Sequence, residues 1–137
     1  MEKEALHVGI SGRGRLSVTE ATAASSVGSG CLPVFATPSM IALMERTAAE
    51  SLLPYLEEGC STVGVHLDVK HLSATPIGMS VRCETELVAL DRRKLTFACK
   101  VYDDTGLVGE GMQERFLVDN ERFMAKTMQK MEAGENG

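Results

Sequence analysis

The chain of 137 residues has no tryptophan, four prolines and 4% aromatic residues, and it has fewer basic than acidic side chains. Its net charge of -5, with no basic cluster, argues against nucleic acid as the main partner. No apolar run approaches the roughly 20 residues of a membrane span, and the acidic N-terminus does not resemble a signal peptide. We therefore expect a cytoplasmic protein that binds neither nucleic acid nor membranes.

Metal-binding and nucleotide-binding signatures are also missing. The four cysteines, Cys31, Cys60, Cys83 and Cys99, form no C-x-x-C pair and have no histidine at zinc-finger spacing. The chain contains neither a phosphate-binding glycine loop nor a G-x-S-x-G motif. We expect structural cysteines, no metal and no cofactor.

Hydrophobic residues make up 44% of the chain, which suits a globular protein with one core. We expect a single domain over 1–137, in which the terminal segments 1–12 and 132–137 are loose. Period-two alternation predicts strands over 13–20, 62–70, 79–87, 94–102 and 107–118. Short connections at 75–78 and 91–93 predict antiparallel neighbours. The glycine-rich stretch 21–33 is either a lid or a plain connector, and a short helix is expected after 119.

The segment 35–53 predicts one long helix. Thr37 is suited to the N-cap and Pro38 to the first helical position, and Pro54 should end the helix near Leu56. Glu45 interrupts an apolar stripe on this helix. A carboxylate there is paired, protonated or lining a cleft, unless it lies at the edge of the stripe and reaches water.

These elements predict an α+β fold in which an antiparallel sheet wraps around one helix, the hot-dog arrangement. One helix covers such a sheet poorly, so we expect at least a dimer. His71 continues the odd-numbered apolar row of the strand 62–70 and should face the helix. Although a lone histidine there is more often a core residue, His71 and Glu45 could share one cleft and activate water or attack an acyl carbon. Thr37 either caps the helix only or lies where free backbone N–H groups favour an oxyanion.

Four stretches, with the separations between them, resemble the fluoroacetyl-CoA thioesterase-type branch of the hot-dog thioesterases. They are 34–45 (VFATPSMIALME), 54–59 (PYLEEG), 71–78 (HLSATPIG) and 114–115 (ER), and the similarity covers about 32–130. The resemblance implies that Thr37, Glu45 and His71 form the catalytic set. It also implies that Gly64 lies beside the thioester and that Arg115 lies near the active site or the CoA.

One departure concerns the loop before Thr37. That family closes its pocket with phenylalanines there, whereas 27–32 (VGSGCL) has no aromatic residue, although Phe35 remains as a substrate-binding candidate. We therefore expect hydrolysis of another short- or medium-chain acyl-CoA, by a homodimer or a dimer of dimers. The residues do not decide whether Glu45 is the nucleophile or the general base. The alternatives are a non-catalytic acyl-CoA binding protein and, less favoured, a hydratase, for which no suitable Asp/His pair is found.

Overall fold

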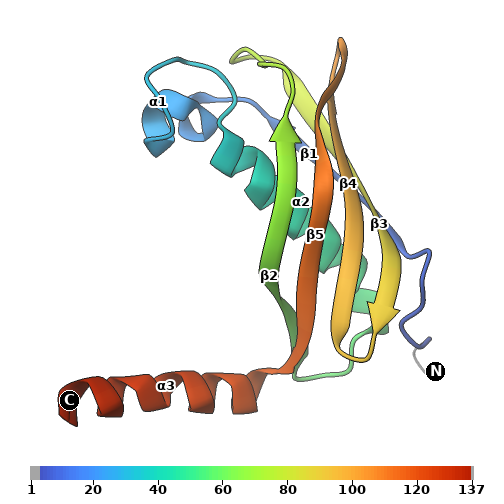
Figure 1. Cartoon of the computed structure of the whole chain (residues 1–137). Coiled ribbons are helices and arrows are strands. Elements are labelled where there is room, and N and C mark those ends of the chain that lie inside the picture. The colour runs from blue at the N-terminus through green and yellow to red at the C-terminus, as the bar shows by residue number, and fades with distance from the viewer. Residues whose placement is uncertain (1–3, 137) are drawn as a thin grey trace.

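The computed structural model describes residues 4–136, and its sheet curves around one long helix (Figure 1). In chain order the elements are β1 (Ser11–Ser17), the 3-10 turn η1 (Glu20–Thr22), α1 (Ala24–Val27), α2 (Thr37–Ser51), the 3-10 turn η2 (Leu53–Tyr55), β2 (Cys60–His71), β3 (Ser80–Asp91), β4 (Lys94–Asp103), β5 (Gly106–Asp119) and α3 (Asn120–Asn136). Buried apolar side chains fill the space between α2 and the sheet. The predicted hot-dog architecture is confirmed.

The sheet is antiparallel throughout, with the order β1-β3-β4-β5-β2. The predicted pairing of β3 with β4 is confirmed, but the prediction that β2 and β3 are neighbours is wrong, because β2 pairs with β5 at the edge of the sheet. The connection 72–79 crosses the end of the sheet, a distance of three strand spacings of about 4.8 Å. It passes beside the start of α2, where the Phe35 N–H donates to the Thr75 carbonyl at 2.9 Å.

Helix α2 begins one residue earlier than predicted. Ala36, in extended conformation, is the N-cap, and its carbonyl accepts the first helical hydrogen bond, from Met40 N–H at 2.9 Å. Thr37 is therefore the first helical residue rather than the cap. The helix ends at Ser51 instead of near Leu56, and Pro54 lies within η2. The hydroxyl of Thr37 is thus free for another partner.

The face of α2 that packs on the sheet is centred on Met40, Met44 and Ala48, each 0% exposed. Ile41 and Glu45 are half-buried beside it. Glu45 therefore lies at the edge of the apolar stripe, on the flank of α2 that faces β2. Helix periodicity leaves open whether Glu45 lies inside the apolar stripe or at its edge, and the structure places it at the edge.

Strand β2 contains a β-bulge at Val65, the residue that lies between the pairs Gly64–Arg115 and His66–Glu114. A bulge adds one residue to a strand and shifts the alternation of the side chains that precede it. The predicted face of Leu67, Val69 and His71 holds after the bulge. Before the bulge the prediction is wrong, because Thr62 and Gly64, and not Val63, face the helix.

Both ends of the chain are more regular than predicted within the described residues. Ser11 and Gly12 belong to β1, and the Gly9 N–H donates to the Leu87 carbonyl at 2.8 Å. The final helix continues to Asn136 and extends away from the body (Figure 1). Large apolar side chains on α3 are exposed, namely Phe123, Met124, Met128 and Met131. Among residues 4–136, no helix has the length and apolarity needed to cross a bilayer.

Candidate active site

Thr37 and His71 meet at the start of α2. The Thr37 Oγ1 lies 2.7 Å from the His71 Nδ1, at hydrogen-bonding distance. The two residues are 34 positions apart in sequence, and the pairing of His71 with Gly109 on β5 holds the end of β2 beside the helix start. A neutral imidazole either accepts a hydrogen bond from the hydroxyl at Nδ1, with its own proton on Nε2, or donates from Nδ1–H to Thr37 Oγ1 and leaves Nε2 unprotonated.

The surroundings of His71 favour the neutral form of its ring and help to orient it. Desolvation by burial lowers the pKa of His71 below 6.5. The Phe35 ring packs edge-on against the imidazole, with ring centroids 6.0 Å apart. The Nε2 atom is buried, and within residues 4–136 no hydrogen-bond partner reaches it. A nitrogen in this state is available to a ligand that enters the site.

A cavity of about 280 Å³ adjoins this pair. Its lining residues are Ala24, Ser29, Val34, Phe35, Thr37, His71, Leu72, Ser73 and Ala74. The glycine-rich stretch forms one wall and folds back on α1, since Ser29 N–H donates to the Ala24 carbonyl at 3.1 Å. Apart from the rings of Phe35 and His71, the side chains of this lining are small or aliphatic, and the stretch 27–32 contributes only Ser29.

Glu45 forms an ion pair with Arg115, whose Nη1 lies 3.2 Å from Glu45 Oε2. The Arg115 side chain is 7% exposed and that of Glu45 is 37% exposed, so the cation is buried while the carboxylate reaches the surface. Gly64 lies opposite the carboxylate, and a Cβ atom added to Gly64 would be 2.5 Å from Glu45 Oε2. The absence of a side chain at Gly64 therefore makes room for the carboxylate.

Two further residues hold Arg115. Thr62 accepts hydrogen bonds from Arg115 Nε at its hydroxyl, at 2.8 Å, and from Nη2 at its carbonyl, at 3.0 Å. Gln113 Oε1 accepts from Nη1 at 3.4 Å. Sequence reasoning missed both residues. The bulge hides the orientation of Thr62, and Gln113 is a polar side chain within a strand whose inward face could not be assigned by alternation alone.

The predicted residues thus form two groups along the same flank of α2. Thr37, His71 and Phe35 lie at the start of the helix, while Glu45, Gly64 and Arg115 lie about 12 Å further along, as eight residues at 1.5 Å each imply. The sequence predicts that Glu45 and His71 share one cleft. Within the described part of one chain Glu45 is not among the residues that line the cavity beside His71, and it is paired with Arg115.

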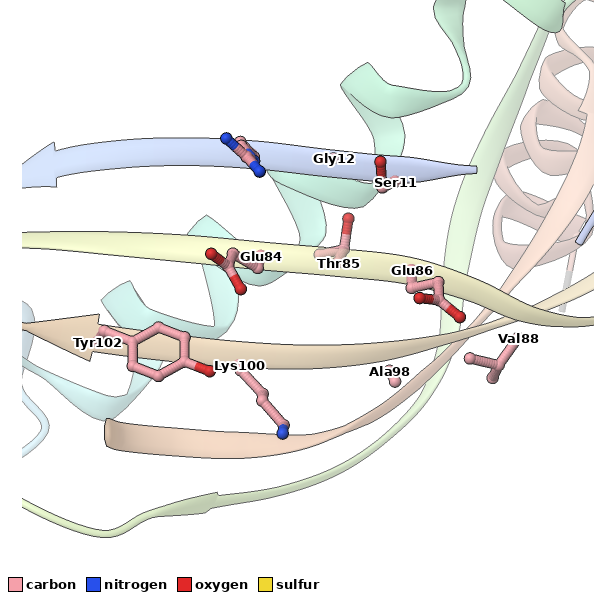
Figure 2. A pocket seen from close by; sticks show the side chains of 10 residues that line it. Ser11, Gly12, Glu84, Thr85, Glu86, Val88, Ala98, Lys100 and Tyr102 are labelled. Atoms are coloured by element: carbon pink, nitrogen blue, oxygen red, sulfur yellow. The ribbon is translucent and has the colours of Figure 1, made fainter. Parts of the chain in front are cut away.

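A larger hollow, of about 420 Å³, lies on strands β1, β3 and β4 (Figure 2). The side chains of Glu84, Glu86, Lys100 and Tyr102 line it together with neighbouring residues. It includes none of the predicted site residues and no histidine. We place the candidate site at α2 and β2, because the hydroxyl and imidazole that contact each other, and the carboxylate that pairs with Arg115, lie there. Within residues 4–136, no group of three or more His, Cys, Asp or Glu could hold a metal ion.

Comparison with known proteins gives consistent matches. The family model described as "FlK: Fluoroacetyl-CoA-specific thioesterase" matches residues 18–121. The fluoroacetyl-CoA thioesterase of Streptantibioticus cattleyicolor is 38% identical over 101 residues, which cover 74% of this chain and 73% of that protein.

Solved structures agree with these sequence matches. A structure of the fluoroacetyl-CoA thioesterase FlK superposes with a TM-score of 0.86 at 30% identity, covering 93% of this chain and 98% of that one. A Thermus thermophilus hypothetical protein described as a thioesterase superfamily member gives a TM-score of 0.88 at 25% identity, with 96% and 97% covered.

Proposed function

This chain belongs to the fluoroacetyl-CoA-specific thioesterase family and is a thioester hydrolase, and on that premise we propose that it cleaves a short- or medium-chain acyl-CoA into the free acid and CoA. We propose Thr37, Glu45 and His71 as its catalytic residues. Fluoroacetyl-CoA itself is not the substrate we favour, because 27–32 offers no aromatic side chain to close the pocket.

The main support is the contact between Thr37 and His71 beside a cavity. The 2.7 Å hydrogen bond fixes the imidazole, while the buried Nε2 lacks a partner among the described residues and can exchange a proton with a bound group. Glu45, on the same flank, reaches the surface while Arg115 holds one of its oxygens. A relative, FlK in a mutant form, has been solved in complex with fluoroacetate and CoA.

The proposed reaction needs a carboxylate, a proton carrier and a hydrogen-bond donor. In one route Glu45 removes a proton from the water that attacks the thioester carbonyl carbon, and the C–S bond then breaks to give the free acid. In the other route Glu45 itself attacks this carbon, the C–S bond breaks to leave a mixed anhydride on Glu45, and water then hydrolyses the anhydride to release the acid. The CoA sulfur leaves with a proton, which His71 can supply or relay. When His71 carries its proton on Nδ1 and donates it to Thr37 Oγ1, the Thr37 hydroxyl proton is free to point at the carbonyl oxygen, near the positive end of α2, as negative charge develops. The residues in these roles need no metal or cofactor.

A homodimer in the cytoplasm belongs to the same proposal. Strand β2 is an edge strand, and its Val65 is 56% exposed. Antiparallel pairing of two β2 edges would place the His71 end of each copy beside the Gly64 end of the other. The two groups of site residues, separate within one chain, would then face one another across the interface.

The proposal is tested by measuring thiol release from a series of acyl-CoA esters, from acetyl-CoA to dodecanoyl-CoA. The wild-type protein should release thiol, with its highest kcat/KM on the short- or medium-chain esters of the series. Glu45→Gln should lower kcat by about a hundredfold or more, or at least about 2.7 kcal/mol of barrier, because it removes the negative charge but little volume. Glu50→Gln, on the exposed side of the same helix, is the matched control and should keep wild-type activity.

Two results would count against the proposal. Tight binding of acyl-CoA with no thiol release by the wild type would indicate a binding protein. Wild-type kcat in Glu45→Gln would show that hydrolysis does not depend on this carboxylate.

A further inference from the structure

Gln113 is a buried polar residue that the proposed reaction does not use. It lies on β5 and is 1% exposed, with its side chain turned toward α2. Its Nε2 donates to the Met44 carbonyl at 2.8 Å and also lies 3.2 Å from the Cys99 Sγ. Its Oε1 accepts from Arg115 Nη1 at 3.4 Å. One amide group therefore connects the backbone of the central helix with the buried guanidinium.

The position of these contacts along α2 is informative. Met44 directly precedes Glu45, and the Arg115 Nη1 that contacts Gln113 also contacts Glu45 Oε2. The contacts form a closed ring from the Met44 carbonyl through Gln113 and Arg115 to the Glu45 carboxylate, and back through the helix. A ring of this kind fixes the distance between the guanidinium of Arg115 and the backbone of α2 at Met44, next to Glu45.

We propose that Gln113 is a positioning residue, which holds Arg115 against α2 and thereby sets the place of the Glu45 carboxylate beside Gly64. The proposal rests on the proposed function for the role of Glu45 in hydrolysis. Gln113 does not touch the substrate, and it acts through Arg115.

Thr62 does not replace Gln113 in this role. Thr62 binds the Nε and Nη2 atoms of Arg115 and belongs to the edge strand β2. The Nη1 atom, which faces Glu45, is held by Gln113 from a strand in the interior of the sheet. Thr62 therefore anchors one side of the guanidinium, and Gln113 sets the position of the other relative to the helix.

The test compares Gln113→Met, which keeps the volume but removes both hydrogen-bonding groups, with Thr47→Val. Thr47 is the matched control because it is also buried, at 1% exposed, and its hydroxyl also donates to a carbonyl of α2, that of Leu43, at 2.7 Å. It lies on the flank of α2 that faces β1, away from Glu45. Both variants should lose some thermal stability. Gln113→Met alone should lower kcat by about tenfold to a hundredfold, with KM changed less than about twofold.

A double-mutant cycle then asks whether Gln113 acts through Arg115. In an Arg115→Met background, adding Gln113→Met should change kcat by less than about twofold, because the cation to be positioned is gone. A crystal structure of Gln113→Met should show the Glu45 carboxylate beyond about 4 Å from Arg115 Nη1, the limit for an ion pair. This last measurement does not depend on catalysis.

The outcomes separate this inference from the proposed function. An inactive wild type with a displaced Glu45 in Gln113→Met would remove the enzymatic proposal and retain the positioning role. Equal kcat losses in Gln113→Met and Thr47→Val, or a full Gln113→Met effect in the Arg115→Met background, would overturn the inference. An undisturbed Glu45–Arg115 pair in the variant structure would overturn it as well.

Discussion

Gly64 offers a way to move the Glu45 carboxylate without changing its chemistry. In Gly64→Ala the new Cβ would be 2.5 Å from Glu45 Oε2, whereas ordinary contacts lie near 3.5 Å, so the oxygen has to move by about 1 Å. The same Cβ would be 3.5 Å from Arg115 Nη1, an acceptable contact that leaves the cation in place. The substitution therefore acts on the carboxylate and its 3.2 Å ion pair.

The expected cost falls on catalysis rather than on folding. A displacement of about 1 Å at a catalytic group lowers the rate by about a hundredfold, equivalent to about 2.7 kcal/mol of barrier. The free energy of unfolding should change by less than about 1 kcal/mol, because the displaced atom is the end of a flexible, 37% exposed side chain. Thiol-release kinetics measure the first quantity, and urea denaturation followed by circular dichroism measures the second.

Two other glycines provide the comparison. A Cβ on Gly111 would be 2.5 Å from the Val69 Cα, so Gly111→Ala should disturb the pairing of β2 with β5 and lower stability by several kcal/mol. Gly134 on α3 has open space around it, and Gly134→Ala should leave kcat unchanged. Wild-type kcat in Gly64→Ala would refute the reasoning, as would a stability loss in Gly64→Ala as large as that in Gly111→Ala.

Two further predictions concern pH and a buried hydrogen bond. Because burial lowers the pKa of His71 below 6.5, the unfolded chain binds the proton more readily, so the free energy of unfolding should fall as pH drops below 6.5. His71→Asn should lack that part of the pH dependence in denaturation curves recorded between pH 5 and 7. Thr75 donates to Asp103 Oδ2 at 2.8 Å in a buried site, so Thr75→Val should cost about 1–3 kcal/mol of stability. Burial opposes ionisation of Asp103, but hydrogen bonds from Thr105, Thr75 and Gly106 outweigh it and lower its pKa. Without the Thr75 hydrogen bond the folded-state pKa of Asp103 should rise toward its unfolded value, so Thr75→Val should lose less stability than the wild type as pH falls below about 4; an unchanged acid limb would contradict the assignment.

Much of the fold could be predicted from local patterns. The long helix and the hairpin of β3 with β4 follow from residues close together in sequence. The place of β2 could not be predicted in this way, because the connection 72–79 is compatible with a wide turn or a crossover, and the choice depends on packing beside Phe35. The position of β2 at the sheet edge is therefore a tertiary property.

The candidate site shows the same division. Glu45 and His71 could be identified because each has an unusual placement in a regular pattern, whereas Thr37 is singled out by its place at the helix start and by the family resemblance. The structure joins Thr37 and His71 at 2.7 Å. The bulge at Val65 breaks the alternation on which the other assignments depend, so the orientation of Thr62 could not be predicted. Glu45 was identified, but its partner Arg115 is 70 residues away, and no spacing rule connects the two.

Five of the eight methionines fall into two chemically different groups. Met124, Met128 and Met131 on α3 are 50%, 54% and 60% exposed, whereas Met40 and Met44 under the sheet are 0% exposed. Peroxide converts an accessible thioether into a polar sulfoxide and reaches a shielded one slowly. Oxidative damage should therefore begin on the projecting helix, turning its apolar side polar, and leave the sulfur atoms of the core in their reduced form.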